Sequence, residues 1–137
     1  MKKFAAICCA VMVLAFTGCS KNLEEEIIGS WRMQSITQTE DFHGQSHSET
    51  VIFDEDEIVI FTFNEDNSFS QESINGEQTF TRSGTYSISG DKLTFIIPDE
   101  EEPFTSVVKI DGSDMTLTYS EIHGEETVNV VASLKKI

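Results

Sequence analysis

The chain has 137 residues, of which 24 are acidic and 9 are basic, and its formal net charge is −15. This length supports a single domain. A surface this acidic repels phosphate groups, so we exclude nucleic acid as a partner, and direct binding to anionic lipid headgroups is unfavourable for the same reason.

The first 18 residues have the layout of a secretory signal peptide. Lys2 and Lys3 precede an uninterrupted apolar run over residues 4–16, and the small residues Thr17 and Gly18 follow it. The run is shorter than the roughly 20 apolar residues of a permanent membrane span. A buried core helix is the alternative interpretation, but the terminal position and the flanking lysines favour a signal peptide. Its removal would take two positive charges from the total of −15 and leave −17.

Cys19 follows this segment directly. Phe16-Thr17-Gly18-Cys19 resembles the lipobox of bacterial lipoproteins, with phenylalanine in place of the usual leucine. The resemblance implies that Cys19 is acylated, becomes the new N-terminus and anchors the protein in the cell envelope, at the outer membrane, through several acyl chains, since one chain binds only marginally. Cys8 and Cys9 would leave with the signal peptide, so no disulfide is expected. A free, reactive Cys19 is the alternative.

Residues 19–28 are predicted to form a lipidated tether. They are polar and then acidic, with Glu24–Glu26 as the acidic cluster. In lipoproteins of the Bacteroidetes type, which the chain resembles here, acidic residues soon after the cysteine direct export to the cell surface. Both surface display and a periplasmic location stay open, and protease treatment of intact cells without a capsule distinguishes them. A solvated linker, or the first turn of a short helix that ends at Gly29, are further alternatives for this segment.

From Gly29 onward the chain alternates apolar and polar residues. The pattern recurs in SWRMQSI, EIVIFTF, SFSQESI, TFTRSGTYSIS, KLTFII, FTSVVKI, MTLTYSEI and TVNVVASLKKI. It predicts half-buried strands, and links such as Asn75-Gly76 suit tight hairpins. We therefore predict an all-β domain over residues 29–137, with about eight antiparallel strands. These either close into an up-and-down barrel, which removes exposed edges, or stack as a sandwich.

Two segments depart from the alternation. Thr39–Glu57 is mostly polar and is expected to form a long loop over one end of the barrel or an outer extension of the second strand. Pro98–Pro103 is an acidic loop between two prolines.

Gly29-Ser30-Trp31 matches the Gly-x-Trp that opens the lipocalin barrel. The later hairpins, among them FTFNEDNSF and SGTYSISGDKLTF, resemble the small lipocalin-like domains of Bacteroidetes lipoproteins. The resemblance implies that Gly29 and Trp31 form a barrel-closing motif, with Trp31 packed under the last strand. In lipocalins an arginine near the end of the chain lies across this tryptophan. Here Lys135 or Lys136 would take that place with its aliphatic stem.

The sequence contains no recognisable catalytic or metal-binding motif. His43 and His47 lie four residues apart without a fixed third ligand. The acidic runs Asp54–Glu57 and Asp99–Glu102 do not have the spacing of a calcium loop. No Gly-x-Ser-x-Gly sequence is present. We therefore expect neither catalysis, nor a metal site, nor a cofactor.

Alternation places a set of large side chains inside the barrel. They either fill it as a core or leave an apolar pocket with a tyrosine hydroxyl as its polar group. Phe69 is expected among the inward-facing side chains. The candidate ligand-binding residues are Met33, Phe61, Phe63, Tyr86, Phe95 and Tyr119.

These observations predict a monomeric, membrane-anchored, lipocalin-like binding module of the bacterial cell envelope that holds a small apolar ligand. The alternative is a solid barrel that acts as an accessory subunit. Such a barrel would contact a protein or glycan through the segments Thr39–Glu57 and Pro98–Pro103.

Overall fold

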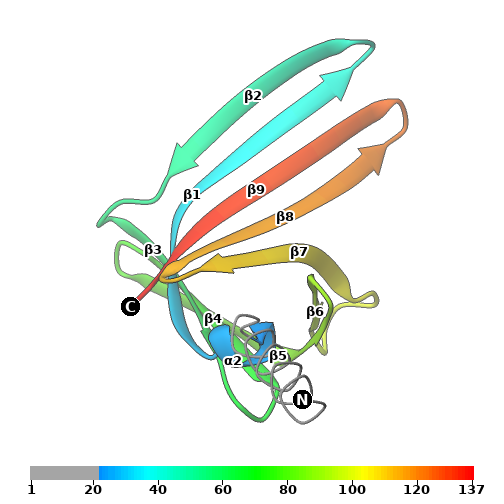
Figure 1. Cartoon of the computed structure of the whole chain (residues 1–137). Coiled ribbons are helices and arrows are strands. Elements are labelled where there is room, and N and C mark those ends of the chain that lie inside the picture. The colour runs from blue at the N-terminus through cyan, green and yellow to red at the C-terminus, as the bar shows by residue number, and fades with distance from the viewer. Residues whose placement is uncertain (1–21) are drawn as a thin grey trace, which may run out of the picture.

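The computed structural model describes residues 22–137, and it shows one antiparallel sheet that closes into a barrel (Figure 1). The predicted all-β barrel is confirmed, and the sandwich is not the fold. The elements in chain order are α2 (Leu23–Glu26), β1 (Gly29–Phe42), β2 (Gln45–Ile52), β3 (Glu57–Phe63), β4 (Ser68–Asn75), β5 (Gln78–Ser89), β6 (Lys92–Ile96), β7 (Phe104–Asp111), β8 (Asp114–His123) and β9 (Glu126–Lys136).

Strand β1 closes the barrel because it pairs on both edges. One edge pairs with β9, from Trp31 opposite Lys136 to Phe42 opposite Glu126. The other edge is divided: Gly29–Arg32 pair with β3, and Ser35–Phe42 pair with β2. The closed ring therefore consists of β1 and β3 to β9, eight strands in all, while β2 lies outside it.

The segment Thr39–Glu57 is a hairpin and a short link rather than a loop. The second half of β1 and the whole of β2 run antiparallel, joined by His43 and Gly44. Figure 1 shows this hairpin projecting from the barrel beside the hairpin of β8 and β9. Every residue of β2 is exposed. The expected long loop is therefore wrong, and of the two expectations the outer extension is the nearer, although it is formed by a separate strand.

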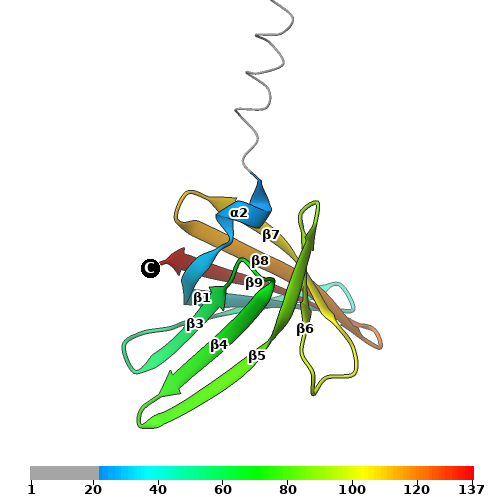
Figure 2. The same cartoon turned by 90° about the horizontal axis from the view of Figure 1, so that it is seen from below.

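Helix α2 lies at the end of the barrel where β1 begins (Figure 2). Asn22 caps the helix, with its side-chain oxygen accepting a hydrogen bond from the Glu24 amide at 3.2 Å. Ile27, directly after the helix, is fully buried in the core. Residues that we expected to form a tether thus pack as part of the fold. The predicted signal peptide and Cys19 lie outside the described residues. No helix within residues 22–137 is both long and apolar enough to cross a membrane.

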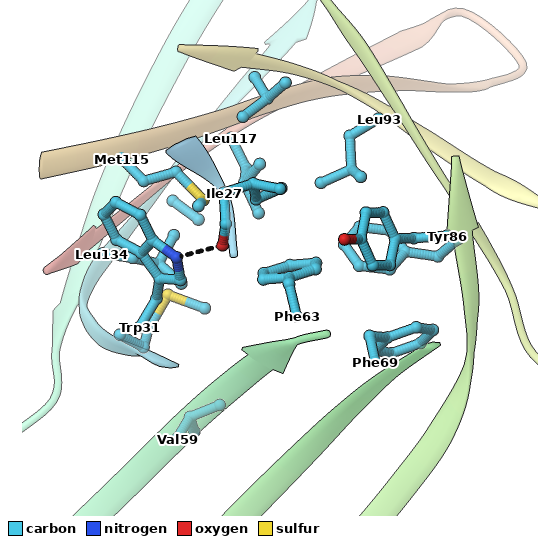
Figure 3. Close-up of a cluster of buried hydrophobic side chains, with 14 of the residues drawn as sticks. Ile27, Trp31, Val59, Phe63, Phe69, Tyr86, Leu93, Met115, Leu117 and Leu134 are labelled. Carbon is cyan, nitrogen blue, oxygen red and sulfur yellow. Dashed lines mark hydrogen bonds between the residues drawn. The ribbon is translucent and has the colours of Figure 1, made fainter. Parts of the chain in front are cut away.

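Trp31 fills this closed end. Its indole Nε1 donates a hydrogen bond of 2.8 Å to the Ile27 carbonyl, and the side chain is fully buried (Figure 3). The ammonium group of Lys136 lies 5.3 Å from the centre of the ring. The expectation that a C-terminal lysine covers the tryptophan is therefore confirmed, and Lys136 is the residue.

Gly29 is required by the same arrangement. Its backbone φ is +128°, a conformation that residues with a side chain rarely adopt. An added Cβ would also lie 3.0 Å from Cε of Lys136. The glycine of the Gly-x-Trp motif thus lets the lysine stem pass close to the backbone on its way to Trp31.

We predict that Gly84→Ala destabilises the barrel. Gly84 lies on β5, and an added Cβ would overlap the carbonyl oxygen of Ile96 and press against the Phe69 ring. Because backbone atoms cannot move aside cheaply, we expect a loss of about 1–3 kcal/mol in the free energy of unfolding. Urea denaturation followed by circular dichroism measures this.

The matched control is Ser83→Ala, one position along the same strand, where the side chain is exposed. This change should alter the free energy of unfolding by no more than about 0.5 kcal/mol. Equal stability of the two variants would contradict the close approach of β5 and β6 at Gly84.

Candidate ligand-binding site

A cavity of about 350 Å³ lies within the barrel, and no residue of α2 lines it. We call this part of the barrel the open end. The cavity is mainly apolar, and side chains from all eight ring strands and from the β6–β7 link line it. They are Met33, Ile36, Phe61, Phe69, Gln71, Arg82, Phe95, Ile97, Glu100, Phe104, Leu117, Tyr119, Val130 and Ala132.

The deep part of the cavity is closed by buried aromatic side chains. Phe69 and Phe95 meet edge to face with their ring centres 4.9 Å apart, and Phe61 lies 6.2 Å from Phe95. Nearer the open end, Phe104 and Tyr119 make another edge-to-face pair at 4.6 Å. Such contacts hold the rings in fixed orientations, so the wall is formed before any ligand binds.

Polar side chains gather at one place on the cavity wall. Arg82 Nη1 lies 3.1 Å from Glu100 Oε1, and Arg82 Nη2 donates a hydrogen bond of 2.8 Å to Gln71 Oε1. The Arg82 and Glu100 side chains are 44% and 46% exposed. They therefore reach from the cavity wall to the solvent and form its polar rim.

The rim lies where the pairing between β5 and β6 is incomplete. Strand β6 ends at Ile96, opposite Thr85, so residues 78–84 of β5 pair with β4 alone. The link between β6 and β7, residues 97–103, passes this stretch of β5 on the edge that β6 leaves without a partner strand. The ion pair between Arg82 and Glu100 joins the link to β5 at that point.

The comparisons with known proteins agree with this geometry. Residues 27–117 match the family model described as a lipocalin-like domain. The chain belongs to the lipocalin-like domain family. No curated protein is significantly similar to it in sequence. The fold is similar to the crystal structure of an uncharacterized protein from Bacteroides eggerthii, with a TM-score of 0.51 and 11% identity over 81% of this chain and 99% of that one.

The lipocalin-like barrel places four of the six predicted ligand-binding residues on the cavity wall, namely Met33, Phe61, Phe95 and Tyr119. Phe63 and Tyr86 do not line it. They lie in the packed core between the cavity and α2, where their rings meet edge to face at 5.1 Å (Figure 3). The Tyr86 hydroxyl donates a hydrogen bond of 2.8 Å to the Asn64 carbonyl. The interior is thus filled at the closed end and open at the other.

The polar rim was absent from the sequence analysis. A signal for two of its members is present, because alternation places Arg82 on the same face of β5 as Tyr86, and Gln71 on the same face of β4 as Phe69. Glu100 lies outside the strands, so no periodicity could identify it. Its contact with Arg82 depends on the path of the β6–β7 link.

His43 and His47, the two histidines weighed in the sequence analysis, both lie on the β1–β2 hairpin. Within residues 22–137 no three His, Cys, Asp or Glu side chains lie close enough together to hold a metal ion. His43 is exposed at the β1–β2 turn and pairs with Glu125 at 2.8 Å, and His47 is exposed on β2.

A second hollow of about 480 Å³ lies beside α2 and is lined largely by polar side chains, with Glu24, Glu25 and Glu65 among them. Tyr86 borders it. Because ligand sites are generally lined by apolar side chains, we assign the ligand site to the first cavity.

Both tyrosines of the chain have a raised pKa. Burial raises the pKa of Tyr86, and Asp66 and Glu24 add to the effect. Burial likewise raises the pKa of Tyr119, with a contribution from Glu121. The Tyr119 hydroxyl therefore stays neutral in the cavity wall through the physiological range.

We predict that both tyrosines of the folded protein ionise with a midpoint above the usual pKa near 10. The rise in absorbance near 295 nm should therefore be centred at a higher pH in the folded protein than in the unfolded chain. The unfolded chain loses protons that the folded chain retains, so stability is fully present below pH 10 and falls as the pH rises through and above it. Urea unfolding at pH 8 and about pH 10.5 measures this loss. Tyr119→Phe isolates the Tyr86 titration, and a midpoint at 10 in either protein would contradict the burial.

Proposed function

We propose that this lipocalin-like domain is a non-catalytic binding module that holds a small apolar or amphipathic ligand in its open-end cavity. The observation that carries the proposal is the cavity itself. It is preformed and mainly apolar, and it has one polar rim, as small-molecule sites generally do. Its volume of about 350 Å³ lies at the lower end of the range of such sites.

The composition of the wall argues against catalysis. None of the lining residues is a histidine, cysteine, serine or aspartate, and the one carboxylate among them, Glu100, is paired with Arg82. Nucleophilic catalysis needs a nucleophile within hydrogen-bond reach of a base. Tyr119 is the one lining residue with a hydroxyl, and its raised pKa makes it a poor nucleophile near neutral pH. We therefore assign the cavity to binding without a cofactor.

We place the domain at the bacterial outer membrane, anchored by the lipid on Cys19. We propose that it is a monomer. Cys19 precedes Asn22 by three residues, a span of roughly 10 Å when extended. Because Asn22 caps α2 at the closed end of the barrel, this anchor would hold the closed end near the membrane. The cavity rim would then face away from it, and the ligand would enter from the aqueous side.

One observation favours the second candidate function, an accessory role in contact with a protein or glycan. The projecting hairpins expose large apolar side chains, with Phe42 at 51%, Ile52 at 75% and Ile122 at 76%. Under this alternative, removal of the β1–β2 hairpin tip or of Pro98–Pro103 spares the barrel and abolishes capture of the partner.

We predict that Tyr119→Trp abolishes binding of the neutral apolar probe N-phenylnaphthylamine without unfolding the domain. Tyr119 is half-buried on the cavity wall, so the larger ring would occupy the space of the ligand. Probe fluorescence measures binding, and native mass spectrometry of the gently purified protein shows whether it retains a natural ligand.

The matched control is Val131→Trp, which adds the same ring to the outer face of β9, between the inward-facing residues Val130 and Ala132. It should leave probe binding unchanged. If both variants bind the probe equally well, or if the unaltered protein binds neither the probe nor any other apolar ligand, the proposed function is wrong.

A further inference from the structure

We propose that the ligand is an amphiphile with a carboxylate headgroup, that its apolar tail fills the cavity, and that Arg82 binds the carboxylate. This inference rests on the proposed function, since it names the class of ligand for the same cavity.

The shape of the cavity sets the size of the tail. If each water-sized group takes about 30 Å³, a volume of 350 Å³ accommodates roughly a dozen such groups. The floor is formed by Phe69, Leu117 and Ala132, which are almost fully buried. A ligand that buries its tail against this floor must leave its polar end at the rim.

Arg82 is the one basic side chain that lines the cavity. Two of its guanidinium nitrogens are engaged, one with Glu100 and the other with Gln71. A guanidinium has five N–H donors in a planar fork that matches a carboxylate. Gln71 lies directly opposite Arg82 in the β4–β5 register and holds it from the neighbouring strand. The donor group is therefore positioned before the ligand arrives.

Glu100 shows which chemistry this position accepts, because a carboxylate already occupies it. It comes from the link between β6 and β7, where residues 98–103 are exposed. An ion pair between two half-exposed side chains contributes little to stability. A ligand carboxylate can thus take the place of Glu100 at small cost. Glu100 would then compete with the ligand from within the same chain.

The other headgroup classes fit less well. A cationic headgroup would meet the charge of Arg82 on the wall. A neutral headgroup would leave the pair of Arg82 and Glu100 intact and gain little from it. The acidic surface opposes an anion, and Asp99, Glu101 and Glu102 lie next to Glu100 on the same link. Salt screens the more distant charges, so the proposal requires that the contact with Arg82 outweigh the repulsion from these three carboxylates.

The experiment compares two ligands of equal chain length, decanoate and decanol, by isothermal titration calorimetry with the folded domain. The unaltered protein should bind decanoate more tightly than decanol. Arg82→Gln should weaken decanoate binding about tenfold or more, because charge-assisted hydrogen bonds are lost, and should weaken decanol binding much less. Glu100→Gln should strengthen decanoate binding several-fold, because it removes the competing carboxylate.

Lys109→Gln is the matched control. It also removes one positive charge, but Lys109 is exposed on the outside of β7, so it should affect neither ligand. The inference is overturned if decanol binds as tightly as decanoate, if decylamine binds more tightly than both, or if Arg82→Gln and Lys109→Gln have equal effects. If decanoate, decanol and N-phenylnaphthylamine all fail to bind, the proposed function itself is wrong.

Discussion

The division of one edge of β1 between two partner strands determines the shape of the whole domain. β1 leaves β3 after Arg32 and joins β2 from Ser35 onward, and its register with β9 shifts between Met33 and Ser35. Such a bulge bends a strand and increases its twist. The first half of β1 therefore closes the barrel against β3, whereas the second half leaves β3 and forms the projecting hairpin with β2 while it stays paired with β9.

The sizes of the inward-facing side chains then divide the interior into a filled and an open part. Near α2 the barrel receives Trp31, Phe63 and Tyr86, which pack with Ile27 into a continuous core. Beyond Phe69 the inward positions of β9 hold Ala132 and Val130, and these small side chains leave space that the aromatic pairs border but do not fill. An eight-stranded barrel is just wide enough for either outcome, so side-chain volume decides between them.

Local sequence pattern predicted the features that depend on one strand at a time. The period of two gave the strands, and the Gly-x-Trp motif led to Trp31 and to a lysine above it. The hairpin at β2 was missed because all its residues are exposed, which leaves no apolar alternation to detect. Phe63 and Tyr86 face inward as predicted. They belong to the core and not to the cavity wall because of their position along the barrel axis. The alternation within one strand predicts which face a side chain is on, but not this position. The Arg82–Glu100 contact was missed because it depends on where β6 ends and how the next link runs.

Lys136 at the closed end and Arg82 at the open end are both cations with a specific partner, and the two contacts have different consequences. At the closed end Lys136 lies over the face of Trp31, an attraction worth about 0.5–1 kcal/mol at a partly exposed site. No ligand can replace this ring, because Trp31 is buried and bonded to Ile27. At the open end Arg82 pairs with a carboxylate on an exposed link, and that partner can be exchanged for another carboxylate. The closed end is thus fixed by its chemistry, while the open end has a partner that a ligand can displace, which is why we place recognition at Arg82.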